Sequence, residues 1–192
     1  VIDKSGKMLS EYSSSLILYN LNGTANALLK KYDDAVKCYE KALQINPNYA
    51  PAYNNLGNIF REKGDIETTI KNYKKAIKIK NDYSEAYYNL GIAYSEKRNF
   101  DLAIDSLSNA LVYKKDYSEA YNQLGLIFEK KGNNLSALNN FFHALKINPN
   151  FAEVFFNLGN IYSKNGEYKT AVENYEKAIK LRENYYQAYC NL

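Results

Sequence analysis

Cysteine and histidine, which act as nucleophiles, bases and metal ligands in many enzymes, occur only three times in this sequence, and their spacing gives none of them a partner. Cys38 and Cys190 lie far apart and form no CxxC motif, and His143, the one histidine, follows Phe142 in an apolar stretch. Catalytic and metal sites need several such groups to converge. We therefore interpret all three as packing or surface residues. The sequence predicts no catalytic residue, no metal site and no cofactor, so this chain is not expected to be an enzyme.

The carboxamide side chains of asparagine and glutamine could bind a ligand through hydrogen bonds, and they recur at a fixed interval. Asparagine or glutamine fills five of six positions spaced 34 residues apart, which are Leu21, Asn55, Asn89, Gln123, Asn157 and Asn191. A carboxamide both donates and accepts, so it can bond the N–H and C=O groups of a peptide backbone. The alternative is that these asparagines only bond a neighbouring helix. Both interpretations stay open at this point.

The same interval governs the elements that must position these side chains. Small residues repeat every 34 residues in two series, which are Gly23, Gly57, Gly91, Gly125 and Gly159, and Ala42, Ala76, Ala110, Ala144 and Ala178. Within one period, apolar residues follow helical spacing on two segments, through Tyr53, Leu56 and Phe60 and then through Ile66, Ile70, Tyr73 and Ile77. Each period therefore predicts two amphipathic helices, and the small residues are expected where the two helices cross.

The repeated unit resembles the tetratricopeptide repeat (TPR). One copy of the motif reads Tyr121, Leu124, Gly125, Phe128, Ala137, Phe141, Ala144 and Pro149, with an aromatic residue at the usual tryptophan position. The resemblance implies an all-α fold, a right-handed superhelical solenoid of TPR helix-turn-helix repeats, in which neighbouring repeats bury faces that one helix pair cannot bury alone. It covers five units, which are residues 16–49, 50–83, 84–117, 118–151 and 152–185.

The two ends of the chain depart from these regular units. We interpret residues 1–15 as the degenerate second helix of a preceding repeat and residues 186–192 as the truncated start of a sixth. Asn22 and Asn26 replace an expected leucine and an expected aromatic residue, so the first helix of the first unit is expected to be distorted. So short a last helix is also expected to leave an apolar patch exposed and to favour end-to-end self-association. The residues of that patch are Tyr175, Ala178, Ile179 and Tyr185.

In the family that these repeats resemble, the first helices line a concave groove, which implies a protein-protein interaction scaffold that binds an extended peptide or partner segment. The resemblance places these residues in an asparagine-rich groove: Asn54, Asn55, Asn58, Tyr88, Asn89, Asn122, Gln123, Phe156, Asn157 and Asn160. Family members that bind chaperone tails hold a terminal carboxylate with lysine and arginine. Glu85, Glu119 and Glu153 occupy one such position here, which argues against that subclass.

Two asparagine-containing segments, residues 49–57 and 187–192, also resemble the repeats of nucleocytoplasmic protein O-glycosyltransferases, the O-GlcNAc transferase and Spindly-like O-fucosyltransferase group. The alternative function is therefore the substrate-recognition TPR arm of such an enzyme. These 192 residues contain no transferase domain, so the full-length protein would have to carry it.

Composition limits the classes of partner and the cellular compartments that are expected for this chain. The net charge is only +4 and is spread along the chain, which argues against a nucleic-acid partner. The apolar runs are too short to span a membrane. A protein or peptide partner is therefore expected. Two cysteines without a disulfide pattern favour a reducing compartment, so a cytoplasmic or nucleocytoplasmic location is expected.

Overall fold

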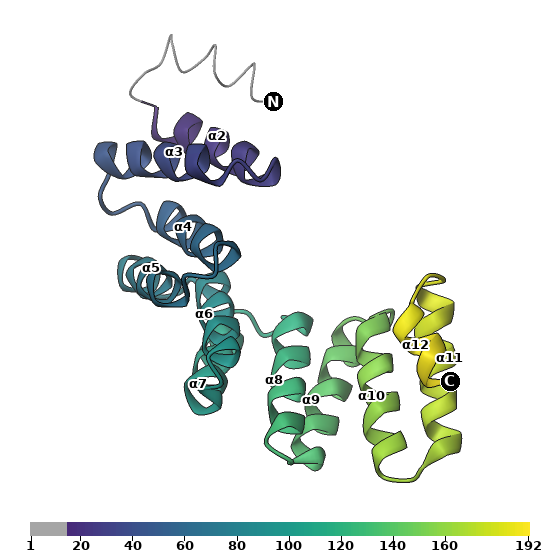
Figure 1. The fold of residues 1–192 in the computed structure, drawn as a ribbon. Helices are drawn as coiled ribbons and strands as arrows, with labels where there is room; N and C mark the ends of the chain where they lie inside the picture. The colour runs from purple at the N-terminus through teal and green to yellow at the C-terminus, as the bar shows by residue number, and fades with distance from the viewer. Residues whose placement is uncertain (1–14) are drawn as a thin grey trace. The chain divides into compact units, whose positions relative to one another are not determined.

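The computed structural model describes residues 15–192, which fold into α-helices joined by short turns (Figure 1). The first helix of each pair has 13 residues: α2 (Leu16–Leu28), α4 (Ala50–Glu62), α6 (Ser84–Glu96), α8 (Ser118–Lys130) and α10 (Ala152–Lys164). The second helix has 14: α3 (Tyr32–Ile45), α5 (Ile66–Ile79), α7 (Phe100–Tyr113), α9 (Asn134–Ile147) and α11 (Tyr168–Leu181). A shorter helix, α12 (Tyr186–Asn191), follows. The all-α helix-turn-helix repeat is confirmed, whereas the helix predicted for residues 1–15 lies almost entirely outside the described residues.

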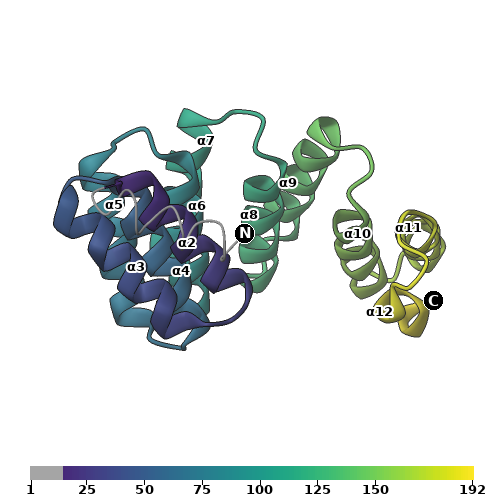
Figure 2. The same cartoon turned by 90° about the horizontal axis from the view of Figure 1, so that it is seen from above.

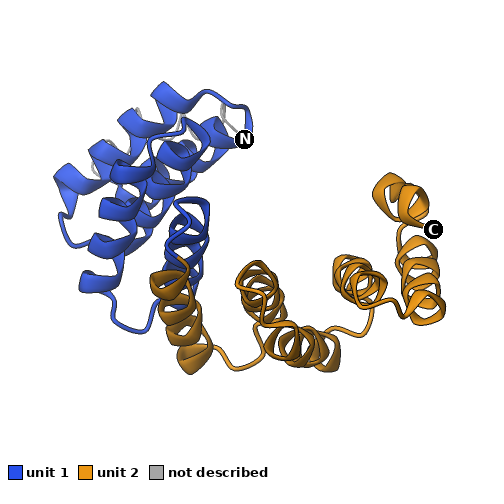
Figure 3. Cartoon of the chain, turned by 60° about the horizontal axis from the view of Figure 1, so that its bottom comes forward, with its two compact units in different colours: residues 1–99 blue, residues 100–192 orange. Residues whose placement is uncertain are grey.

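Two compact units make up the chain, residues 1–99 and residues 100–192 (Figure 3). The described part of the first unit contains α2 to α6, and the second unit contains α7 to α12. Within each unit, consecutive helices are neighbours in space, as α10, α11 and α12 are in Figure 2. This arrangement is the one expected for stacked repeats. None of the described helices combines the length and apolar character needed to cross a membrane.

The glycine series packs directly on a ring of the second helix. The pairs are Gly23 with Tyr39, Gly57 with Tyr73, Gly125 with Phe141, and Gly159 with Tyr175. A Cβ atom on Gly125 would lie 2.5 Å from Cε1 of Phe141, closer than two such carbon atoms approach. The two helices of these pairs therefore cross too closely for any side chain at the glycine position. The predicted role of these four glycines at the helix crossing is confirmed.

The hydroxyl group of a ring in this series is matched by a polar residue on the first helix. The Tyr73 hydroxyl donates to Oδ1 of Asn58 over 2.7 Å. Phe141, which has no hydroxyl group, occurs with Leu126 at the position that corresponds to Asn58. Tyrosine on the second helix thus occurs with a polar residue on the first helix, and phenylalanine occurs with an apolar one. The reason is that a buried hydroxyl group needs a hydrogen-bond partner.

The chain reverses after each first helix through a residue with positive φ. Gly64, Gly132 and Gly166 have φ angles of 79°, 77° and 83°. In the other two such turns the residue is Lys30, with φ of 58°, or Arg98, with φ of 60°. A residue with a Cβ atom pays a steric cost in this left-handed region, which glycine avoids.

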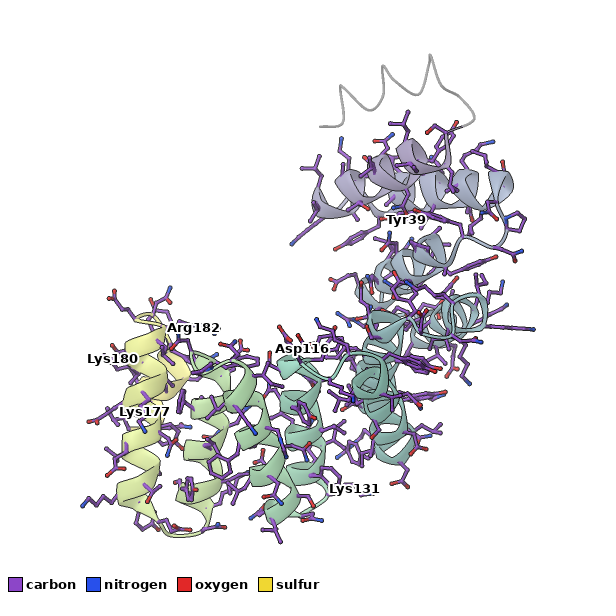
Figure 4. The ribbon with its side chains drawn as sticks, turned by 180° about the vertical axis from the view of Figure 1, so that it is seen from behind. Tyr39, Asp116, Lys131, Lys177, Lys180 and Arg182 are labelled. Carbon is purple, nitrogen blue, oxygen red and sulfur yellow. The ribbon has the colours of Figure 1, made fainter. Side chains whose placement is uncertain are left out.

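Exposed lysine–carboxylate pairs connect a turn with the second helix of the repeat before it. The pairs are Lys63 with Asp33, Lys97 with Glu67, and Lys131 with Asp101, of which Lys131 is labelled in Figure 4. All three recur at the same place in the repeat. Because these side chains are largely solvated, each pair adds little to the stability of the protein.

The expectation of a distorted first helix is wrong. α2 has the same 13 residues as the other first helices. Asn26 is buried, and its Nδ2 donates to the backbone oxygen of Asn22 over 3.0 Å. The polar side chain therefore finds its partner within its own helix, and the helix tolerates it.

The four residues expected to form an exposed apolar patch near the C-terminal end are buried or half-buried instead, so this expectation is also wrong for them. Tyr175 is 3% exposed, Ala178 and Tyr185 are buried as well, and Ile179 is half-buried. Ala188 of α12 belongs to the same core cluster as Ala178 and Tyr185. The small side chain of Ala188 lets α12 lie close to α11, so even this short helix covers the residues. They therefore provide no basis for end-to-end association.

Candidate binding site on the first helices

Asparagine side chains link neighbouring first helices in pairs. Asn89 on α6 donates from Nδ2 to Oδ1 of Asn54 on α4 over 3.0 Å. Asn157 on α10 donates in the same way to Asn122 on α8, also over 3.0 Å. All four side chains are buried. Each pair holds two first helices together, because separating the helices would leave buried amide groups without partners.

These pairs bear on the two interpretations of the groove asparagines, which are binding of a peptide backbone and bonding of a neighbouring helix. Asn54 has 0% of its surface exposed, and its Nδ2 donates to Oε1 of Glu85 over 3.0 Å. Its donor and acceptor groups are therefore both used inside the protein. The placement of these residues agrees with the alternative interpretation, in which asparagine bonds a neighbouring helix. The residues are Asn54, Asn89, Asn122 and Asn157.

A cavity of about 350 Å³ opens between α2 and α4. Ala27, Leu28 and Ile59 supply apolar walls, and Asn55 and Asn58 supply amide groups. Asn55 donates from Nδ2 to Oδ1 of a neighbouring asparagine over 3.1 Å, and Asn58 accepts one tyrosine hydroxyl. Each amide keeps further donors and acceptors. Two of the predicted groove residues are thus brought together beside an apolar surface.

Tyrosine rings close the inner side of this cavity. Tyr39 and Tyr32 both line it, and Tyr39, labelled in Figure 4, belongs to the core cluster that joins α3 to α4. The Tyr39 hydroxyl lies 3.2 Å from the hydroxyl of Thr24, which also lines the cavity. Burial raises the pKa of the Tyr39 phenol, with a smaller opposing effect of the Thr24 bond. The ring therefore presents a neutral, rigid wall at ordinary pH.

α2 presents an exposed apolar stripe that reaches the cavity at Leu28. Ile17, Leu21 and Leu28 are 64%, 52% and 81% exposed. Their spacing of four and seven residues places them on one face of the helix. At the positions of Ile17 and Leu28, the later repeats have proline or charged residues, which are Pro51, Glu85, Glu119 and Glu153, and Glu62, Glu96, Lys130 and Lys164. The apolar stripe is therefore particular to the first repeat.

A second cavity of about 350 Å³ occupies the corresponding place between α10 and α12. Its lining residues are Asn160, Ser163, Lys164, Tyr175 and Asn191. Each follows by four 34-residue periods a residue that lines the first cavity, namely Thr24, Ala27, Leu28, Tyr39 and Asn55. Oδ1 of Asn160 accepts from both the Tyr175 hydroxyl and Nδ2 of Asn191. Equivalent positions thus line a cavity in two places along the chain. The cavity between α2 and α4 has apolar walls, and the one between α10 and α12 has polar walls.

The remaining predicted groove residues lie outside these two cavities. Tyr88 and Gln123 are half-buried on α6 and α8. Phe156 packs against Tyr175 and Tyr185, with ring centroids 5.9 and 5.1 Å apart. The Phe156 ring is therefore part of the packing between α10, α11 and the turn that follows.

The residues with possible catalytic chemistry remain separate from both cavities. His143 stacks on Tyr121, with ring centroids 5.2 Å apart. Burial raises the pKa of the Cys38 thiol, which disfavours the reactive thiolate. Among the described residues, no three histidine, cysteine or acidic side chains gather as a metal site would require.

Family models match most of the sequence. A model described as TPR repeat matches residues 23–60, 57–98 and 130–166, which is more than half of the chain. Models described as tetratricopeptide repeat match residues 84–117 and 152–185. The chain belongs to the tetratricopeptide-repeat family. TPR repeats generally mediate protein–protein interaction and are typically non-catalytic.

Solved TPR structures resemble the chain over most of its length. MamA has a TM-score of 0.75 and 27% identity, covering 86% of this chain and 96% of MamA. PilF of Pseudomonas aeruginosa has a TM-score of 0.84 and 21% identity, covering 92% and 80%. The TPR protein YrrB has a TM-score of 0.73 and 23% identity, covering 99% and 98%. At these low identities, the likeness to PilF and YrrB shows the fold alone.

A curated relative shares a shorter segment with this TPR protein. The uncharacterized protein ycf37 of Pyropia yezoensis is 44% identical over 50 residues, which is 26% of this chain and 28% of the relative. The match therefore spans little more than a quarter of that relative's length. None of the relatives named here is described as a glycosyltransferase.

The apolar stripe on α2 was missed by reasoning from the sequence. The asparagine series drew attention to the positions where repeats agree, whereas Ile17 and Leu28 are positions where the first repeat differs from the others. Comparing each position of α2 with its counterparts one period apart would have identified them, because apolar residues stand there in place of proline or charged ones. Leu21 already indicated this difference, because it is the one apolar residue in the carboxamide series.

Proposed function

We propose that this TPR chain is a protein-binding scaffold, and that a segment of the partner binds across α2 and α4 with an apolar side chain in the cavity between them. The observation that carries the proposal is the combination of this cavity with the exposed stripe of Ile17, Leu21 and Leu28. Exposed apolar surface of this kind beside a hollow is typical of binding sites. A volume of about 350 Å³ is within the range of ligand-binding pockets.

The amide groups in the cavity support binding of an extended segment. Asn55 and Asn58 retain donors and acceptors that can bond the backbone of the partner beside its apolar side chain. Lys30 and Glu62 line the same cavity and place one charge of each sign there. The site thus favours a peptide with one apolar anchor and polar neighbours over a purely charged ligand.

The cavity between α10 and α12 supports a second contact point with different preferences. Asn160, Ser163 and Lys164 replace Thr24, Ala27 and Leu28 at equivalent positions. A polar or acidic side chain would suit this cavity better than an apolar one. The structure of YrrB is described as having an unusual peptide-binding site, which is a property of that protein, and the shared fold makes such a use accessible here.

Selection of peptides from a displayed library on the immobilised chain tests the proposal. Selected peptides should share an apolar anchor residue, and Leu28→Ser should weaken their binding by about tenfold, the effect of losing roughly 1.4 kcal/mol of apolar contact. Leu135→Ser is the matched control, because Leu135 is 73% exposed on α9 and does not line the cavity. Equal loss in both variants, or none in Leu28→Ser, would contradict the proposed site.

The alternative function, the substrate-recognition arm of a protein O-glycosyltransferase, rests on the asparagine-rich segments alone. The pairing of Asn54 with Asn89 and of Asn122 with Asn157 gives these residues a bracing role. Fewer asparagines are then left to hold a substrate backbone. The scaffold proposal is therefore the stronger of the two, and the glycosyltransferase arm stays a prediction about the full-length protein.

A further inference from the structure

Helix α5 carries a concentration of positive charge that the other second helices lack. Its exposed face has lysine at four positions with helical spacing, which are Lys71, Lys74, Lys75 and Lys78. The equivalent residues are Lys37, Glu40, Lys41 and Gln44 on α3, Asp105, Ser108, Asn109 and Val112 on α7, Asn139, Phe142, His143 and Lys146 on α9, and Glu173, Glu176, Lys177 and Lys180 on α11. The fold therefore does not require lysine at these positions. We call these four residues the α5 lysine face.

Two hollows adjoin the α5 lysine face. All four lysines line a hollow of about 420 Å³ together with Ile70. Lys75 and Lys78 also line a second hollow of about 570 Å³. That second hollow is floored by apolar side chains, which are Pro47, Tyr53 and Ile79. The face thus combines ammonium groups with apolar surface within reach of the same ligand.

The carboxylate that lines the smaller hollow does not neutralise this face. Glu67 also lines the smaller hollow, but it is paired with Lys97 in the next turn. Lys74 lies over the Tyr94 ring at 5.7 Å and Lys75 over the Tyr53 ring at 5.1 Å, measured from Nζ to the ring centroid. These contacts fix the two ammonium groups in place without cancelling their charge.

We propose that the α5 lysine face is a second interaction surface that binds an acidic segment of a partner protein, with an apolar side chain of that segment in the adjoining hollow. Lys71 and Lys78 are seven residues apart, which is about 10 Å along the helix axis. A short segment with a few glutamates or aspartates matches this length, and its apolar residue matches the floor of Tyr53 and Ile79. This surface lies on a second helix, so it is distinct from the cavity between α2 and α4.

The same observations disfavour a nucleic acid as the occupant. Single-stranded nucleic acids bind through bases stacked on accessible aromatic rings and through basic groups that follow the backbone. Here the two nearby rings are covered by Lys74 and Lys75, and the charge is confined to two turns of one helix. The apolar floor would remain unused by a phosphate backbone.

Fluorescence anisotropy with a labelled glutamate-rich peptide that carries leucine tests the proposal. Lys71→Gln combined with Lys78→Gln removes two charges that lie over no ring, so folding should be preserved, as circular dichroism can verify. Binding should weaken by at least about threefold, from the loss of two exposed ion pairs. The control is Lys37→Gln combined with Lys41→Gln, which makes the same charge change at two of the equivalent positions on α3 and should leave the affinity within experimental error.

Changes to the peptide and to the salt concentration test the proposed contacts further. Glutamine in place of the peptide glutamates should abolish binding, and serine in place of its leucine should weaken it. Added salt should weaken the parent complex, because exposed charges are screened. Equal loss in the α3 control would show a general charge effect and overturn the proposal. Tighter binding of a single-stranded RNA than of the peptide would overturn it in favour of a nucleic-acid site.

Discussion

Asn89 donates a hydrogen bond to Asn54 over 3.0 Å, and the pair joins α4 to α6 in a buried contact. The equivalent pair of Asn157 and Asn122 joins α8 to α10. These bonds determine how the asparagine series is divided. The buried pairs brace the first helices. Asn55 makes the equivalent bond to Asn20 of α2 but is only half-buried, and it lines the cavity together with Asn58.

Asn89→Ala should therefore destabilise the protein. The change leaves Oδ1 of buried Asn54 without its donor, which should lower the free energy of unfolding by about 1–3 kcal/mol. Denaturant unfolding followed by circular dichroism measures the effect. Asn54→Leu combined with Asn89→Leu removes both polar partners and should cost less than the single change. If Asn89→Ala unfolds like the parent, the bracing role is wrong.

Gly125→Leu should be strongly destabilising. A Cβ atom alone would lie 2.5 Å from the Phe141 ring, so a leucine must push α8 and α9 apart. The expected loss of stability is about 1–3 kcal/mol or more. Thermal unfolding checks this, with Leu135→Ala on the exposed face of α9 as a control that should change little. A melting temperature equal to that of the parent would contradict the close crossing.

Arg98→Gly should stabilise the protein by a fraction of a kcal/mol. Arg98 has φ of 60°, a region that is costly for residues with a Cβ atom by roughly 1–2 kcal/mol, part of which glycine's greater freedom in the unfolded chain offsets. The reverse change, Gly132→Arg in the equivalent turn, should destabilise. Urea midpoints of both variants provide the measurement. Shifts of the same sign in the two variants would be inconsistent with this explanation.

Tyr73→Phe should cost about 1 kcal/mol, because Asn58 loses the hydroxyl that it accepts. Adding Asn58→Leu should restore much of that loss, since the pair then copies Phe141 and Leu126 of a later repeat. A double-mutant cycle on unfolding free energies measures the coupling. Additive effects of the two changes would argue against a matched pair.

Stability should fall at alkaline pH through the buried Tyr73 and the half-buried Tyr83. Burial raises the pKa of Tyr83 to about 12 and raises that of Tyr73 further. Tyrosine in the unfolded chain ionises near pH 10, so the unfolded state loses protons first. The stabilising contribution is complete below about pH 10 and is lost as the pH rises toward the folded pKa. Unfolding free energies measured from pH 8 upward should therefore decline more steeply for the parent than for Tyr73→Phe.

The sequence predicted the fold well because the residues that repeat are the residues that pack. Gly125 and Ala144 recur because two helices approach closely there, and the glycine contact is found in four of the five repeats. The binding site was harder to predict for the opposite reason. Leu28 matters because it differs from Glu62 and Glu96 at the same position, and a pattern based on agreement between repeats gives it no weight. That Asn55 is half-buried while Asn89 is buried depends on helix packing that the repeat pattern does not contain.

The place where a selected peptide binds is the most direct measure of the proposed function. Methyl-detected nuclear magnetic resonance during titration with such a peptide reports on Ala27, Leu28 and Ile59 around the cavity, and on Val112 and Leu135, which are exposed on α7 and α9. The proposal predicts that the three cavity methyl signals shift and saturate together while the other two stay unchanged. Shifts confined to Val112 and Leu135, with Leu28 unmoved, would contradict it.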